Sequence, residues 1–190
     1  MKPLAAFAIL CAAPVPAGLA ACGSGAENAS MLHGADARPR LRVDARLREL
    51  GPDGWHRVAL YANWDFVEPE VWRWIVAQPD CDRATALAIF WQAGPDHYVA
   101  FADRERVPPV SRDGYELVTS IRDRWLAGAY RRAELAFDRT RDITPVDLDA
   151  LERRYGDRVA RMIPPSMRAP LPGRRIADDG TPLPGTLRRS

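Results

Sequence analysis

The chain has 190 residues, 47% hydrophobic and 27% charged, which is typical of one globular domain rather than two. Its formal net charge of +2 is too small to indicate a nucleic-acid-binding surface built on basic residues. Lys2 is the only lysine, and the other 26 basic residues are arginine. Because arginine and alanine codons are GC-rich, we attribute this bias to a GC-rich genome, and no function follows from it.

The first part of the chain has the organisation of an export signal. Lys2 gives a positive start, residues 4–13 form an unbroken apolar run, and small residues precede Cys22. A membrane-spanning helix needs about 20 apolar residues, and this run is shorter and is followed by prolines. We therefore predict that residues 1–21 are a signal peptide that is removed.

The sequence Leu19-Ala20-Ala21-Cys22 resembles the lipobox of bacterial lipoproteins. The resemblance implies that Cys22 is acylated, becomes the new N-terminus and anchors the protein to the cell membrane. Since Gly23 rather than aspartate follows the cysteine, we expect the lipid anchor to lie in the outer membrane if the cell is Gram-negative. Residues 22–37 are small and polar and are predicted to form a flexible tether. The alternatives are an ordinary secretory signal cleaved near Ala21 or a wrongly assigned start codon.

Residues 38–163 show helical spacing of apolar side chains, which predicts an all-α domain, an irregular bundle of about six helices. Gly51-Pro52-Asp53-Gly54 is expected to end the first helix, whereas Thr144 and Pro145 are expected to begin the last. A short extended piece is an option at residues 97–101. The expected helices cover residues 41–50, 55–62, 68–79, 82–93, 114–137 and 144–162. The fourth is apolar nearly all round and is predicted to be central.

Residues 164–190 are rich in proline and glycine, so neither a helix nor a strand is expected there. We predict a disordered tail. Its arginines could contact an acidic membrane, but Asp178 and Asp179 interrupt them, and a solvated tail is the favoured interpretation.

Five of the six tryptophans lie between residues 55 and 91. Trp74 and Trp91 occupy apolar faces at helical spacing, so a role in the hydrophobic core is favoured over ligand binding. Trp64 and Trp72 are expected to be the most exposed of the group. Together with Asp65 they are the candidate partner-binding residues.

Four short motifs occur in order: Asn63-Trp64-Asp65, Trp74-Ile75, the segment 79–82 (PDCD) and the segment 85–91 (TALAIFW). They resemble the bacterial family called domain of unknown function 4274, over about residues 54–105. The resemblance implies a mainly helical bacterial domain with no established activity. No catalytic residue can be carried over from it.

Ordinary structural chemistry also explains these motif residues. Asp82 stands directly before an apolar helix, where a carboxylate accepts hydrogen bonds from the first free N–H groups, with Thr85 three residues later. Asn63 and Asp65 are typical of a turn between two helices. We therefore assign Asn63, Asp82 and Thr85 structural roles.

Catalytic and metal-binding motifs are sparse. Cys81 is the only cysteine left in the predicted mature chain, so no internal disulfide can form. The least implausible catalytic dyad joins Cys81 to His56 or His97. The three histidines are widely spaced and Cys81 has no second cysteine nearby, so we expect no metal and no other cofactor.

Three functional hypotheses follow from the sequence. The first is a lipid-anchored protein of the cell envelope that binds an unknown protein partner or acts as an accessory module. The second is an immunity or inhibitor protein against a secreted toxin. The third is an envelope hydrolase that uses Cys81 and a histidine. Binding is favoured over catalysis because capping and turn chemistry accounts for each polar residue singled out.

Overall fold

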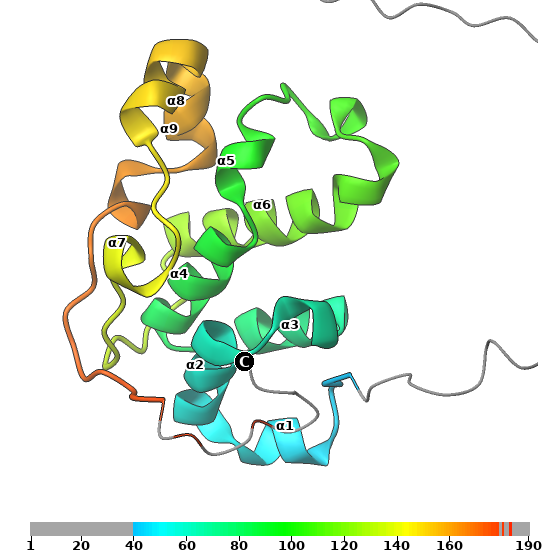
Figure 1. Ribbon diagram of the computed structural model, residues 1–190, viewed down its shortest axis with the longest axis vertical. Helices are drawn as coiled ribbons and strands as arrows, with labels where there is room; N and C mark the ends of the chain where they lie inside the picture. Colours follow the sequence, from blue (N-terminus) through cyan, green and yellow to red (C-terminus); the bar gives the residue numbers. More distant parts are fainter. Residues whose placement is uncertain (1–39, 179, 181–182, 184–190) are drawn as a thin grey trace, which may run out of the picture. The chain divides into compact units, whose positions relative to one another are not determined.

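The computed structural model describes residues 40–178, 180 and 183, and within them the fold is all-α, as predicted (Figure 1). These residues form nine α-helices and four short 3-10 helices, and their only β-pairing is three isolated bridges. The predicted signal peptide, Cys22 and the predicted tether lie outside the described residues.

The first two helices begin and end differently from the prediction. Helix α1 covers only Ala45–Glu49, because Leu41 instead forms an isolated bridge with Val67. Helix α2 covers Gly51–Tyr61 and therefore includes the Gly-Pro segment that was expected to interrupt the helices. Proline is compatible with the first helical turn, since its missing N–H has no partner there in any case.

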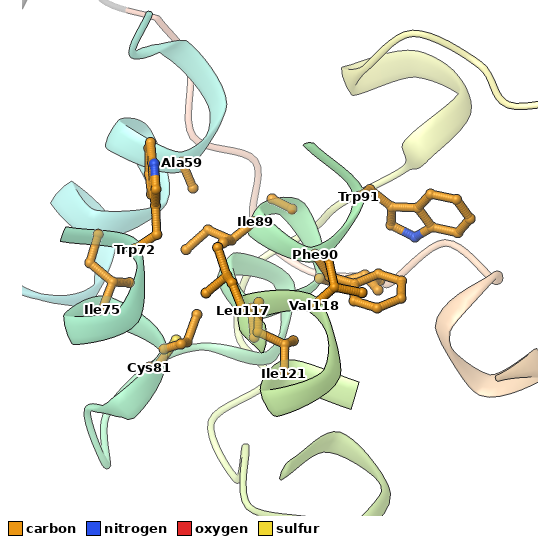
Figure 2. Close-up of a cluster of buried hydrophobic side chains, with 14 of the residues drawn as sticks. Ala59, Trp72, Ile75, Cys81, Ile89, Phe90, Trp91, Leu117, Val118 and Ile121 are labelled. Carbon is orange, nitrogen blue, oxygen red and sulfur yellow. The ribbon is translucent and has the colours of Figure 1, made fainter. Parts of the chain in front are cut away.

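Helices α3 (Pro69–Ala77) and α4 (Arg83–Gln92) confirm the predicted elements. Eight of the ten residues of α4 are buried, and this helix packs against α2, α3 and α6. Figure 2 shows side chains of the surrounding helices converging on it, with Trp72 and Ile75 from α3 and Ile121 from α6. The fourth predicted helix is therefore the centre of the hydrophobic core.

Helix α5 (Pro95–Tyr98) covers the first two residues of the segment 97–101, for which an extended piece was an option, and a turn follows it. Two 3-10 turns follow, at Arg104–Arg106 and Pro109–Ser111, and lead into α6.

Helix α6 covers Arg112–Leu126 and is eleven residues shorter at its C-terminal end than predicted. Gly128 has a φ of +67°, a left-handed conformation that stops the helix. Beyond it the chain is extended, and Leu135 and Phe137 form isolated bridges with Arg174 and Leu171. Ala129 and Ala133 continue the helical spacing but are not buried, whereas Leu135 and Phe137 are buried where the chain pairs with a distant segment.

The single predicted helix over residues 144–162 is also wrong. Two shorter helices, α8 (Leu148–Tyr155) and α9 (Asp157–Met162), take its place, and a further short helix, α7 (Arg139–Asp142), precedes them. Asp147 rather than Thr144 caps α8, accepting a hydrogen bond from the Ala150 N–H at 2.9 Å. Gly156, with a φ of +54°, separates α8 from α9.

The described part of the C-terminal segment is packed rather than disordered. Met167 is fully buried, and its carbonyl accepts a hydrogen bond from the indole N–H of Trp91 at 2.9 Å. Arg174 donates to the Asp53 carboxylate at 2.9 Å. A 3-10 turn at Pro165–Met167 is the one helical element among the described residues of this segment, and the rest of the chain docks in an irregular conformation. Positions 179, 181–182 and 184–190 of the predicted tail lie outside the described residues.

Candidate functional site

A surface cleft of about 930 Å³ opens between the helical core and the chain that leads into α8. The core side contributes residues from the end of α2, the 3-10 turn Trp64–Phe66, α4 and α5. The opposite side is residues 142–155. Aromatic and aliphatic side chains from both sides line it, namely Trp64, Trp91, Phe101, Leu151 and Tyr155.

The core side of the cleft is shaped by the short helix α5. Gly94 has a φ of +71° and turns the chain after α4, and Pro95 starts α5 in its first turn. The His97 ring meets the rings of Tyr98 and Phe101 edge to face, with centroids 5.0 and 5.6 Å apart. Tyr98 is buried while His97 is exposed, so packing on the aromatic neighbours holds the imidazole at the cleft surface.

The opposite side depends on an arginine that contacts the core. The Arg139 guanidinium lies 5.1 Å from the centre of the Trp91 ring, and its Nη1 donates to the Val146 carbonyl at 3.3 Å. The cation–π contact thus fixes the loop before α8 against α4. Asp138 begins the short helix α7, and hydrogen bonds from the Thr140 hydroxyl and N–H lower the pKa of this carboxyl.

Three carboxylates line the cleft, Asp96, Asp142 and Asp147, along with the basic residues His97 and Arg154. Asp142 is already engaged, because it pairs with Arg175 at 2.9 Å and accepts from the Asp138 N–H at 2.7 Å. Asp147 accepts from the backbone at the start of α8. Asp96 is the cleft carboxylate best placed to meet a ligand, since within the described residues no side-chain hydrogen bond or ion pair engages it.

The predicted partner-binding residues differ in how far they are exposed. Trp64 is half-buried and lines the cleft, and its ring stacks on Trp72 with centroids 4.2 Å apart and planes 20° from parallel. Trp72 was expected to be exposed but is only 3% exposed, because its face of α3 packs on the core with Val71 and Ile75. Asp65 is exposed, and its backbone N–H donates to the Asn63 side chain at 3.2 Å.

The two structural motif residues of α4 belong to a buried polar cluster. Asp82 is fully buried and caps α4, accepting from the Ala84 N–H at 2.8 Å. Its other oxygen accepts from the N–H groups of Glu134 and Leu135, at 2.8 and 3.3 Å. Thr85 is also buried, and its hydroxyl lies 3.0 Å from Nδ1 of His56.

These polar contacts stabilise the fold rather than perform chemistry. The His56 ring is fully buried, and burial lowers its pKa, although the negative charge of Asp82 opposes the shift. A neutral, inaccessible imidazole hydrogen-bonded to a threonine joins α2 to α4. Asp82 joins α4 to the extended chain after α6, a long-range role that its position as a helix cap did not reveal.

Cys81 is poorly suited to act as a nucleophile. It is fully buried, and burial together with the neighbouring Asp82 carboxylate raises the pKa of its thiol to about 12. Only the thiolate is reactive, and almost none is present at neutral pH. Of the two histidines considered with it, His56 is buried beside Thr85, and His97 is exposed at the cleft, which Cys81 does not line.

The described residues contain neither a metal-binding cluster nor a membrane-spanning helix. No group of three or more histidine, cysteine, aspartate or glutamate side chains in this part of the chain is arranged to hold a metal ion. No helix in residues 40–178 is long and apolar enough to span a bilayer.

The fold and the cleft define an all-α domain with a large surface cleft. Residues 51–126, from α2 to α6, match the family model of a domain of unknown function (DUF4274), which confirms the resemblance predicted from the short motifs. No curated protein and no solved structure matches the chain. The matched residues include Trp64, Trp91 and His97, whereas the opposite side of the cleft, residues 142–155, lies beyond them.

Several cleft residues had no sequence pattern that could have revealed them. Asp96 lies in α5, a helix too short to show a helical period, and Phe101 follows that helix. Leu151 was predicted as part of one long helix seam, and it lines the cleft instead. Trp64 and His97 are the lining residues that the sequence singled out for a functional role, whereas Trp91, Thr144 and Pro145 were given only structural roles and line the cleft as well.

Proposed function

We propose that the protein is a binding module of the bacterial cell envelope, anchored by a lipid on Cys22, and that its cleft takes a segment of a partner protein. The main support for this binding site is the cleft itself, which is about 930 Å³ in volume and lined by Trp64, Trp91 and Phe101. Such aromatic side chains supply large contact areas and dominate the energetics of protein interfaces.

The chemistry of the cleft favours binding over catalysis. Among the described residues that line it there is no cysteine or serine, and the carboxylates of Asp142 and Asp147 already accept hydrogen bonds within the protein. A hydrolase needs a nucleophile beside a base that a third group orients. The His97 ring instead packs on aromatic neighbours.

The charge of the cleft indicates the kind of segment that would fit. Asp96 has no ionic partner among the described residues, and Arg154 stacks over the neighbouring Tyr155 ring at 5.1 Å. An aromatic cleft with an available carboxylate suits a segment that carries both apolar and basic side chains. The partner is therefore a protein with such a segment exposed at the cell envelope.

Site-specific photo-crosslinking tests the binding site. A photoreactive amino acid at Ala100, an exposed residue that lines the cleft, should crosslink a discrete envelope protein in living cells. The same group at Ala77, exposed at the end of α3 and outside the cleft, should not. Equal crosslinking from both positions would overturn the assignment of the cleft.

Two tryptophan substitutions measure the contribution of the cleft. Trp64→Ala should weaken partner binding about thirtyfold, the loss expected from truncating a hot-spot residue. Trp74→Ala is the matched control, because Trp74 is also half-buried but packs edge to face on Trp55, away from the cleft. Circular dichroism must show both variants folded. If both folded variants bind equally well, the cleft is not the interface.

The identity of the captured partner separates the remaining hypotheses. A secreted toxin would specify the immunity or inhibitor function. A hydrolytic activity that is lost in His97→Ala while partner binding is kept would replace the proposal with an enzyme.

The lipid anchor is tested separately from the cleft. The sequence Leu19-Ala20-Ala21-Cys22 supports acylation of the cysteine. Cys22→Ala should abolish labelling by radioactive palmitate and leave uncleaved or unanchored protein, whereas Cys81→Ala should leave labelling unchanged. Palmitate labelling that persists in Cys22→Ala would overturn the lipoprotein assignment without affecting the cleft.

A further inference from the structure

A second, smaller pocket of about 270 Å³ lies between α5, α6 and α9. It shares Phe101 with the cleft but is otherwise lined by different residues. Its polar lining consists of three arginines and two tyrosines, from three separate helices, namely Arg122, Arg158, Arg161, Tyr98 and Tyr115. This combination concentrates hydrogen-bond donors and positive charge in a volume suited to a small anion.

The three arginines differ in how far their charge is neutralised. Arg122 pairs with Asp123 at 2.7 Å, and its Nη1 donates to the Arg161 carbonyl at 3.3 Å. It therefore links α6 to α9 and contributes little free charge. Arg158 and Arg161 have no carboxylate within ion-pair distance in the part of the chain that the structure describes, and Arg158 makes one long contact to the Ala100 carbonyl, at 3.4 Å.

Ring packing holds the two tyrosines of the pocket in place. The rings of Tyr98 and Tyr115 meet edge to face, with centroids 5.7 Å apart. The Tyr98 hydroxyl lies where a side chain at position 114 would stand, so glycine is required there. Burial raises the pKa of Tyr98, so its phenol stays protonated at neutral pH. Because this hydroxyl lies against Gly114, which does not line the pocket, Tyr98 contributes a fixed wall and the arginines supply the donors.

We propose that this pocket binds a phosphate group, with Arg158 and Arg161 as its charged contacts. Guanidinium groups bind phosphate oxygens through paired, charge-assisted hydrogen bonds, and they are more weakly hydrated than ammonium groups. Two arginines without a carboxylate partner, beside a tyrosine wall, provide both charge and donors. The phosphate group belongs either to a free ion or to a lipid headgroup, and the two sources share this chemistry.

Isothermal titration calorimetry of the full chain with inorganic phosphate tests the pocket. The double variant Arg158→Gln/Arg161→Gln should weaken phosphate binding at least about tenfold, the loss expected for removing charge-assisted hydrogen bonds. The matched control is Arg131→Gln/Arg153→Gln, which removes the same charge from two exposed arginines outside the pocket. The control should bind phosphate like the wild type.

Two results would overturn the phosphate site. One is an equal loss of affinity in the two double variants, which would show attraction to overall charge rather than to a pocket. The other is a wild-type dissociation constant weaker than about 10 mM, too weak to distinguish from nonspecific attraction.

Vesicles distinguish the two sources of phosphate. With Cys22→Ser in every protein to remove the lipid, binding to phosphatidic acid vesicles is compared with binding to phosphatidylcholine vesicles. If the pocket double variant loses phosphatidic acid binding and the control keeps it, the headgroup is the source. If only inorganic phosphate binding is lost, the source is a soluble ion.

Discussion

Residues 51–126 and residues 127–178 are held in place by different interactions. In the first region, α2, α3, α4 and α6 pack through apolar faces, with α4 buried among them. In the second region, α7, α8 and α9 are short, and extended chain covers much of the distance between them. Buried side chains of this second region, among them Phe137, Ile163 and Met167, join the same hydrophobic core, and individual polar contacts fasten the extended chain further.

Most of these fastening contacts come from side chains of the helical core. The indole N–H of Trp91 donates to the Met167 carbonyl at 2.9 Å, and that of Trp125 donates to the Ser166 hydroxyl at 3.1 Å. The Tyr61 hydroxyl donates to the Ile176 carbonyl at 2.9 Å. Aromatic residues of the core thus have two functions, packing with their rings and holding distant chain with their polar groups.

The two sides of the cleft come from these two regions. Its core side belongs to helices whose positions are set by burial, whereas its opposite side, residues 142–155, belongs to the fastened region. Loss of core packing should therefore unfold everything. Loss of a fastening contact should release the second region first, because local opening costs less free energy than global unfolding.

The largest effect is expected from Phe90→Ala in the centre of α4. Phe90 is fully buried, and its removal should lower the free energy of unfolding by about 3–5 kcal/mol. Urea unfolding followed by circular dichroism measures this loss. Leu126→Ala is the control, since Leu126 is 62% exposed at the end of α6. A loss for Phe90→Ala no larger than for the control would show that α4 is peripheral.

The next effect tests the buried Asp82 carboxylate, which joins the two regions. Asp82→Asn keeps the shape of the side chain but turns an amide donor toward the Ala84 N–H or toward those of Glu134 and Leu135. We expect a loss of about 2–3 kcal/mol, with Asp80→Asn, on an exposed side chain, nearly neutral.

Hydrogen exchange then separates local from global opening in Asp82→Asn. The amides of residues 134–137 should exchange faster, by a larger factor than the amides of α4. An equal increase in exchange rate for both groups of amides would show that the two regions unfold as one unit. It would contradict the expectation that the second region opens first.

A smaller effect is expected at the C-terminal anchor. Met167→Ala removes a fully buried side chain and should cost about 2 kcal/mol, the lower part of the range for such truncations, because the surrounding irregular chain can adjust. The measurement is limited proteolysis, which should cut residues 163–178 before the helical core. Met162→Leu is a volume-conserving control in α9, and simultaneous cleavage of both regions would contradict the expectation.

The smallest effect is a dependence of stability on pH. Burial holds the pKa of His56 below its ordinary value of 6.5. The unfolded chain therefore binds the proton more tightly than the folded one, so stability is complete above pH 6.5 and falls as the pH decreases below that value. Urea midpoints at about pH 7.5 and about pH 5.5 measure the decline.

His56→Asn tests the source of that decline. Asparagine can keep a polar group near the Thr85 hydroxyl but does not titrate. The variant should lose much of the decline between the two pH values, whereas His97→Asn, at an exposed position, should retain it. An unchanged decline in His56→Asn would show that another group is responsible.

The secondary structure was predicted more accurately in the first region than in the second. Helices α3 and α4 were predictable because Pro69, Pro79 and Asp82 mark their ends and their apolar residues follow a helical period. The predicted helix over residues 114–137 failed after Leu126, since Ala129 and Ala133 satisfy the period without being buried, and Phe137 pairs with a distant segment. Periodicity alone does not say which partner buries a side chain.

The candidate site was less predictable than the fold. Trp64 and His97 drew attention as residue types, and both line the cleft. Trp72, singled out with them, is buried because α3 turns that face to the core. Trp91 contacts a residue 76 positions away in the chain, and Trp125 contacts one 41 positions away. No local sequence pattern encodes such pairings.

The sequence by itself determined the all-α class, the central position of α4 and the cap at Asp82, because these depend on the chemistry of neighbouring residues. Only the tertiary structure decided where residues 127–178 lie, and with them the second side of the cleft and the arginine-lined pocket. Their positions depend on single hydrogen bonds and buried anchors such as Met167. Such contacts form only when the helices that supply the partners are already packed, so their free energy is a property of the folded chain and not of any short segment.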